Sequence, residues 1–229
     1  LPGRADAAIT EGVMTRFCIM RIVTNTFNDD PTAGSRPFTA NRDGFVLSEG
    51  AWMFVMEGEE TARARGAHIY AEVAGYGSTC DAYHRVRMDE NGEERARAMM
   101  LAMKDAGVDP SEVDYVNYHG TSTDLNDRIE TRAVKLAFGD HATRLAGSAT
   151  KSMIGHPQGA CGSAGVAATL MAFRDDILPP TINLDTPDPE CDLDYIPNVG
   201  RKQDVTYAMS NSFAFGGLNA VLVFGPPPA

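Results

Sequence analysis

Two short segments of this chain combine imidazole, amine and hydroxyl side chains with glycine. The first, residues 119–123, reads His-Gly-Thr-Ser-Thr, and the second contains Lys151 and His156. Each segment follows a short, largely apolar stretch that we predict to be a buried strand, over 113–118 and 146–150. Ligands bind at the carboxyl ends of strands in α/β folds. If the two strands are neighbours, both histidines converge, and we predict a functional site there.

Two neutral imidazoles that point at one position can donate N–H hydrogen bonds to an oxygen that acquires negative charge. Lys151 beside them is costly if it is buried without a partner, and Glu130, one turn into the following helix, is a candidate partner. An ordinary surface position is the alternative for Lys151. Two histidines also suit a metal, but no third ligand stands at metal-type spacing, so we predict no metal site.

Hydroxyl and aromatic side chains surround these groups in the sequence. The hydroxyls of Thr121, Ser122 and Thr123 can hydrogen-bond an elongated polar ligand, and loop capping is the alternative, above all for Ser122. The segment 213–217 reads Phe-Ala-Phe-Gly-Gly, which pairs bulky rings with flexible glycines. This composition suits a gate whose ring can swing, and a simple turn between core strands is the alternative.

The composition is that of a soluble globular protein. The chain has 229 residues, 43% of them hydrophobic and 22% charged, with a net charge of −11. The acidic balance argues against a nucleic-acid or anionic-membrane binder, although a local basic patch remains compatible with an acidic partner. No apolar run reaches the length of a membrane span, and we expect no signal peptide.

Four widely spaced cysteines form no CxxC pair, which argues against a metal or disulfide framework and fits a reducing compartment. Cys161 lies in a Gly-Ala-Cys-Gly run that superficially resembles the turn around a catalytic thiol. A small residue in a closely packed helix is the interpretation that we favour.

Hydrophobic periodicity and Gly/Pro punctuation predict an α/β fold with a mixed sheet and a final hairpin-like pair of strands. The first helix has Thr10 or Asp6 as its cap, residues 51–56 are expected to be covered on both faces, and 75–84 is expected to be a loop. The predicted helices cover 7–23, 58–65, 93–106, 126–138 and 158–173. The predicted strands cover 45–56, 69–74, 113–118, 146–150, 205–209 and 220–224.

Several long motifs, in order and at compatible spacing, resemble the β-ketoacyl-[acyl-carrier-protein] synthases, with the ketosynthase II branch as the nearest type. The resemblance runs almost end to end. It rests on residues 119–123, on Lys-Ser-Met-Ile-Gly-His at 151–156, on Arg-Asp-Gly-Phe-Val-Leu-Ser-Glu-Gly-Ala at 42–51, and on Asn-Ser-Phe-Ala-Phe-Gly-Gly at 211–217.

The resemblance implies the thiolase fold, in which two similar α/β halves stack as five layers (αβαβα). Residues 1–65 resemble the C-terminal tail of the first half, and residues 66–229 resemble the whole second half. The chain therefore looks like the C-terminal portion of such an enzyme.

The family chemistry is a decarboxylative Claisen condensation, in which malonyl-carrier protein loses CO2 and its carbanion attacks an acyl thioester held on a cysteine. By motif, the catalytic residues would be His119, His156, Lys151, Glu130 and Phe215. The substrate-binding residues would be Thr121, Thr123, Phe213, Gly216, Gly217 and Asp81. No bound cofactor is expected, because phosphopantetheine arrives on the acyl carrier protein.

None of the four cysteines stands in the Thr-Ala-Cys-Ser context of the family nucleophile, so we expect another segment or chain to supply it. The alternative is a non-condensing subunit, of the decarboxylase or chain-length-factor type, that partners an active ketosynthase. The resemblance implies a cytoplasmic protein that meets an acyl carrier protein and forms a homodimer or a heterodimer with a ketosynthase chain. It implies no nucleic-acid or membrane partner.

Overall fold

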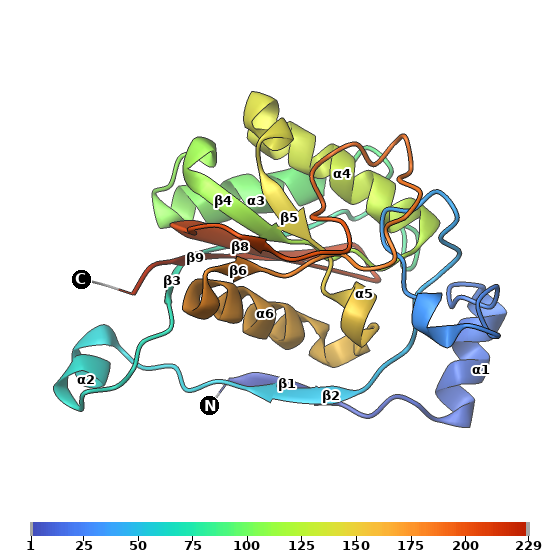
Figure 1. Ribbon diagram of the computed structural model, residues 1–229, viewed down its shortest axis with the longest axis horizontal. Helices are drawn as coiled ribbons and strands as arrows, with labels where there is room; N and C mark the ends of the chain where they lie inside the picture. Colours follow the sequence, from blue (N-terminus) through green and yellow to red (C-terminus); the bar gives the residue numbers. More distant parts are fainter. Residues whose placement is uncertain (1, 228–229) are drawn as a thin grey trace.

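A five-stranded mixed sheet lies at the centre of the computed structural model, which describes residues 2–227. Its strand order is β3-β9-β8-β4-β5, and β9 runs opposite to the other four strands (Figure 1). The strands are β3 (Glu72–Cys80), β4 (Val113–Asn117), β5 (Ala146–Ser148), β8 (Tyr207–Ala214) and β9 (Leu218–Gly225). The predicted α/β class, mixed sheet and final hairpin are therefore confirmed.

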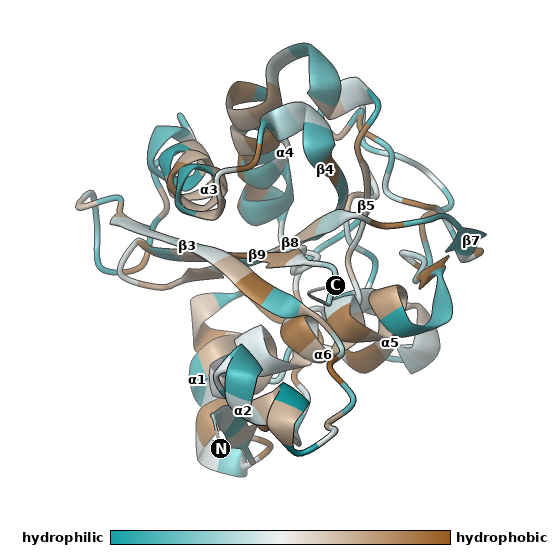
Figure 2. Cartoon of the chain, turned by 90° about the vertical axis from the view of Figure 1, so that its left-hand side faces the viewer, coloured by the Kyte–Doolittle hydropathy of each residue, from teal (hydrophilic) through white to brown (hydrophobic). Residues whose placement is uncertain are grey.

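Helices cover both faces of this sheet (Figures 1 and 2). α3 (Glu93–Ala106) and α4 (Asp124–Phe138) pack on one face, and α6 (Cys161–Asp175) packs on the other. An antiparallel ribbon of β1 (Gly3–Asp6) and β2 (Gly50–Met53) lies against α6 on the side away from the sheet. The remaining α-helices and strands in the described part of the chain are α1 (Glu11–Met20), α2 (Glu59–Ala64), α5 (Lys151–Ile154), β6 (Ile177–Leu178) and β7 (Arg201–Lys202).

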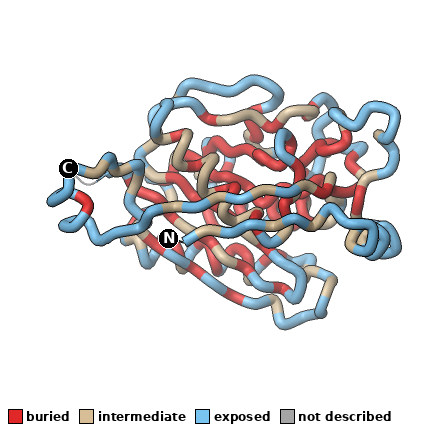
Figure 3. The backbone as a smooth tube through the Cα atoms, turned by 90° about the horizontal axis from the view of Figure 1, so that it is seen from below, coloured by how far each residue is buried: buried red, intermediate tan, exposed pale blue. Residues whose placement is uncertain are grey.

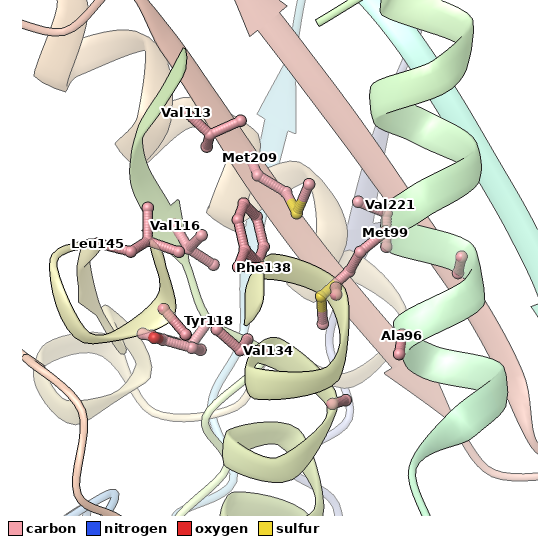
Figure 4. Close-up of a cluster of buried hydrophobic side chains, with 14 of the residues drawn as sticks. Ala96, Met99, Val113, Val116, Tyr118, Val134, Phe138, Leu145, Met209 and Val221 are labelled. Atoms are coloured by element: carbon pink, nitrogen blue, oxygen red, sulfur yellow. The ribbon is translucent and has the colours of Figure 1, made fainter. Parts of the chain in front are cut away.

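The main core lies between the sheet and the α3–α4 layer, and Figure 4 shows its centre. Met99 of α3 and Val134 and Phe138 of α4 pack toward Val116 and Met209 of the sheet. Buried residues occupy the middle of the molecule, and exposed residues surround them (Figure 3). This core fixes the positions of β4, β5 and β8, whose carboxyl ends carry the predicted site residues.

The predicted helix over 93–106 coincides with α3, but β3 differs from its prediction. Residues 75–80 were predicted as part of a loop, and they belong to the strand. A β-carbon at Gly75 would lie 2.3 Å from the Ala102 carbonyl oxygen, and one at Gly77 would lie 2.0 Å from that of Ala98. The glycines therefore allow α3 to approach the strand, and do not mark a turn.

The N-terminal predictions were partly wrong. The first helix is shorter than 7–23, because Thr10 caps its start and Arg21, with a φ of 55°, ends it in the left-handed conformation. The strand predicted over 45–56 is reduced to β2, and within residues 2–227 it is covered on one face only, by α6, where cover on both faces was expected. Met53, Val55 and Met56 are 60%, 67% and 58% exposed, because β2 pairs with β1 at the outside of α6.

The remaining differences concern element ends. α4 begins two residues earlier than predicted, with Thr123 as its N-cap residue. The helix predicted over 158–173 is α6, and Lys151 lies in the separate short helix α5. β8 continues through 210–214, so the connection to β9 is a tight turn. All five strands of the sheet follow residue 66, and the division of the chain at 65/66 stays a prediction.

Candidate functional site

The two predicted loops converge as expected. β4 and β5 pair in parallel, and the rings of His119 and His156 lie edge to face with centroids 5.5 Å apart. The approach is close at Gly120, where a β-carbon would lie 2.4 Å from that of Ala149. Gly120 has a φ of +37°, which an L side chain rarely adopts, so glycine is needed here for both space and conformation.

Two carboxylates of α4 hold the 119–123 loop. Glu130, fully buried, accepts the backbone N–H groups of His119 and Gly120, each at 2.8 Å. Asp127 accepts the N–H of Thr121 at 3.1 Å through one oxygen and the N–H of Phe38 at 2.9 Å through the other. These bonds satisfy backbone donors that would otherwise be buried without partners, and they fix the loop relative to the helix.

Lys151 is 5% exposed and lies at the start of α5. The structure does not pair it directly with Glu130, and in the described part of the chain no carboxylate forms an ion pair with its ammonium group. The third partner of Glu130 is the side-chain amide of Asn211 on β8, at 3.1 Å. Glu130 is therefore placed to hold the backbone of the His119 loop, and Lys151 is a buried cation beside the two rings.

Both imidazoles are held in the neutral form. Burial, then the positive charge of Lys151, lowers the pKa of His119 well below its ordinary value and lowers the pKa of His156 to about 3. The Nδ1 atoms of both rings are buried without a hydrogen-bond partner in residues 2–227. Neutral rings beside a fixed cation suit hydrogen-bond donation to a developing oxyanion.

A cavity of about 620 Å³ opens onto these groups. Thr121 and Thr123 line it together with both histidines, and the two threonine hydroxyls are hydrogen-bonded to each other at 2.8 Å. Ser122 does not line it: its hydroxyl accepts the N–H of Arg36 at 3.1 Å, which supports the capping alternative for this residue. The cavity volume suits a ligand of substrate or cofactor size.

The two aromatic residues of 213–217 occupy different environments. Phe213 is 3% exposed and its ring lies edge to face with that of His119, with centroids 5.8 Å apart. Phe215 is 41% exposed at the cavity wall. Gly216 and Gly217 follow with φ values of +85° and +76°, so the turn that carries Phe215 depends on glycine.

Asp81 lies against this turn. Its backbone N–H donates to the Gly217 carbonyl at 2.8 Å, and its carboxylate accepts the side-chain amide of Asn219 at 2.7 Å and the N–H of Asp89 at 3.3 Å. A conformational change in the turn at 216–217 would therefore displace the segment that follows β3. Among the predicted site residues, Asp81 contacts Gly217, and it does not itself line the cavity.

The sequence interpretation gave no role to the buried ion pairs behind the loop. Arg42 donates to the carbonyl oxygen of Thr123 at 3.1 Å and to the carboxylate of Asp188 at 2.7 Å, and lies 3.5 Å from that of Asp127. Burial raises the pKa of Asp127 to about 6. The one available signal was the position of Asp127 in the first turn of a helix that follows a hydroxyl-rich loop.

The four cysteines are free thiols in different environments. Cys18 and Cys80 are exposed and Cys191 is buried, whereas Cys161 is partly buried at the start of α6 and lines the cavity. The Sγ atom of Cys161 lies 3.9 Å from the Ser212 hydroxyl. Among residues 2–227, no three His, Cys, Asp or Glu side chains are grouped to hold a metal ion, and none of the helices is suited to crossing a membrane.

Comparisons with known proteins give this site a family. Residues 70–185 match the family described as beta-ketoacyl synthase, C-terminal domain. The chain is 50% identical over 222 residues to 3-oxoacyl-[acyl-carrier-protein] synthase 2 of Synechocystis sp., covering 97% of this chain and 53% of the relative. It is 49% identical over 224 residues to the protein of the same name from Staphylococcus aureus, covering 98% of this chain and 55% of the relative.

Solved structures agree with the sequence relatives. A ketosynthase of a type II polyketide synthase, in complex with its acyl-carrier protein and bound to the hexaketide, superposes with a TM-score of 0.95 at 37% identity, covering 97% of this chain and 54% of that chain. The ishigamide ketosynthase/chain length factor superposes with a TM-score of 0.89 at 39% identity, covering 98% and 53%.

The chain belongs to the β-ketoacyl synthase family, and its fold is thiolase-like. It corresponds to the C-terminal portion of the enzymes that it matches, and it spans about half the length of these curated relatives. The family and fold predicted from the motifs are therefore confirmed.

Proposed function

We propose that this chain provides the decarboxylation site of a β-ketoacyl-acyl-carrier-protein synthase in fatty acid or polyketide biosynthesis. One observation carries the proposal: two imidazoles held neutral beside a buried cation face a cavity large enough for a thioester. Both relatives above are named as synthases of this kind.

In the proposed reaction a malonyl thioester enters the cavity, and the bond between its α-carbon and its carboxylate breaks to release CO2. The electron pair of that bond moves into the thioester as an enolate, and His119 and His156 donate hydrogen bonds to the enolate oxygen. Because the rings are already neutral donors at fixed positions, they require little reorganisation when the charge develops. The enolate carbon then attacks an acyl thioester and expels the thiolate that carried the acyl group.

The other residues act around this step. Lys151 keeps a positive charge beside the rings, and Glu130 holds the backbone that positions His119. Thr121 and Thr123 contact the phosphopantetheine arm that brings the malonyl group. Phe215 is the gate, with its backbone N–H in the oxyanion hole, and Phe213, Gly216, Gly217 and Asp81 shape the turn that carries it. No bound cofactor is required.

The partner follows from the substrate. We propose that an acyl carrier protein delivers the malonyl group, which is supported by a similar ketosynthase solved with its acyl-carrier protein. The condensing cysteine is proposed to lie outside these 229 residues, since none of the four cysteines stands in the Thr-Ala-Cys-Ser context and the relatives are about twice as long. The proposed assembly is a homodimer, or a heterodimer with a ketosynthase chain.

The test is CO2 release from malonyl-carrier protein by the protein produced from its complete reading frame. His156→Ala should lower the rate by about 100-fold or more, as for the loss of one oxyanion donor elsewhere. Lys151→Ala should lower the rate as well. His68→Ala is the matched control and should leave the rate unchanged, because His68 is exposed and is not among the site residues. Unchanged decarboxylation in His156→Ala would refute the assigned role.

A non-condensing subunit is the second candidate, favoured by the similarity to the ishigamide ketosynthase/chain length factor. The two candidates differ in one product. A condensing enzyme given an acyl donor and malonyl-carrier protein forms a β-ketoacyl thioester, and a non-condensing subunit forms none until an active ketosynthase is added. Phe215→Ala should change which acyl chains are accepted if the protein is a condensing enzyme, and should have no such effect if it is a non-condensing subunit.

A further inference from the structure

Arg95 is a buried cation that the reaction above does not use. It lies in the first turn of α3 and is 2% exposed. Its Nη1 donates to the side-chain oxygen of Asn126 at 3.0 Å, and its Nε has no hydrogen-bond partner within residues 2–227. A buried guanidinium whose Nε–H has no acceptor lowers the stability of the fold. Stability therefore does not explain the position of Arg95, and its other contacts suggest a different role.

The central carbon of this guanidinium (Cζ) lies over the ring of Phe213, 4.4 Å from its centroid. The same ring lies edge to face with the imidazole of His119. Arg95, Phe213 and His119 therefore form one continuous series of contacts that joins α3 to the carboxyl end of β8 and to the loop after β4. Cation–π attraction in a dry interior favours this arrangement over a loosely held ring.

A second series reaches the same loop through polar groups. Asn126, which accepts from Arg95, donates to Asp127 at 3.1 Å, and Asp127 accepts the backbone N–H of Thr121. Burial lowers the pKa of Arg95, and the negative charges of Glu130, Asp81 and Asp127 oppose that effect. Arg95 thus lies among the carboxylates that hold the loop and the 215–217 turn.

We propose that Arg95 is a positioning residue of this site: it holds the Phe213 ring against His119 and, through Asn126 and Asp127, holds the 119–123 loop. The proposal rests on the proposed decarboxylation for its catalytic consequence. Arg97 on the same helix is the matched comparison, because it is exposed and pairs with Glu94 on the surface. If Arg95 only filled space, substitution by an apolar side chain of similar length would leave the imidazole where it is.

The test compares Arg95→Met, Arg95→Lys and Arg97→Met in the protein produced from its complete reading frame. Arg95→Met removes a desolvated charge and keeps the length, so we expect Tm to be unchanged or raised. CO2 release should fall about 10- to 100-fold in kcat, with little change in KM, because misplaced catalytic groups lower kcat. Arg95→Lys should recover part of the loss, since an ammonium can lie over the ring but lacks the planar fork.

The independent readout is the pair of ring C–H resonances of His119, which are sensitive to the neighbouring Phe213 ring and need no turnover. They should shift in Arg95→Met and stay in place in Arg97→Met. Unshifted resonances, or shifted resonances with kcat within about twofold of wild type, would overturn the proposal. A wild-type protein that releases no CO2 would instead refute the proposed function, and the resonances would then decide whether Arg95 positions His119.

Discussion

Replacement of Glu130 by Gln tests how the His119 loop is held. One carboxylate oxygen accepts the N–H of His119 and the amide of Asn211, and the other accepts the N–H of Gly120. A Gln side chain has the same length but offers a single acceptor, so its NH2 group must face at least one of these donors. Losing one hydrogen bond to a charged group costs about 1.5–3 kcal/mol of stability.

We expect Glu130→Gln to lower the free energy of unfolding by about 2 kcal/mol, measured by urea denaturation. Glu94→Gln is the matched control, because Glu94 pairs with Arg97 at the surface, where such a pair contributes about 0–1 kcal/mol. Backbone amide signals of His119 and Gly120 should shift in the first variant only. Equal stability losses in the two variants would refute the inference that Glu130 holds the loop.

Three further predictions concern the frame of the site. Gly77→Ala should lower the free energy of unfolding by about 1–3 kcal/mol in urea denaturation, because the added carbon meets the backbone of α3. Gly12→Ala is the control, because a carbon added there meets no other atom within 4 Å, and equal losses of stability in the two variants would contradict the packing argument. Arg42→Met should cost about 3–5 kcal/mol in the same measurement, since it leaves Asp127 buried without its cation, against about 0–1 kcal/mol for Arg128→Met at the surface. The pKa of His156 is lowered from 6.5 to about 3 in the folded protein. Between these pH values the unfolded chain binds a proton at this ring and the folded protein does not, so the free energy of unfolding should fall as the pH drops from 6.5 toward 3. This fall should be shallower in His156→Gln, and parallel pH profiles would show that the ring is not held neutral.

Periodicity identified most of the elements, and motif spacing identified the two converging loops. α3 was predictable because Met and Ala recur along one face and Gly107 closes the helix with a left-handed residue. β3 was not, because Gly75 and Gly77 have the composition of a turn and their role depends on the distant helix that they contact. Arg95 was missed because its role depends on its contact with Phe213, which is distant in the sequence. A charged residue on the apolar face of a predicted helix was the signal that could have identified it.

The sequence predicted which residues form the site better than it predicted which groups each of them contacts. Glu130 was expected near Lys151, and the structure shows it bound to the backbone of the His119 loop. That contact depends on the angle at which α4 leaves the loop, which the buried Arg42–Asp127 pair and the core beneath it determine together. Sequence spacing alone does not give such an angle.

The most direct test of the decarboxylation site is NMR of the imidazole nitrogens at neutral pH, with and without a malonyl thioester analogue in which an amide replaces the thioester. Selective assignment uses the variants His119→Ala and His156→Ala. We predict neutral rings in the free protein and a shift of the N–H signals of both His119 and His156 when the analogue binds. A protonated ring in the free protein, or analogue binding that leaves both signals in place, would contradict the account.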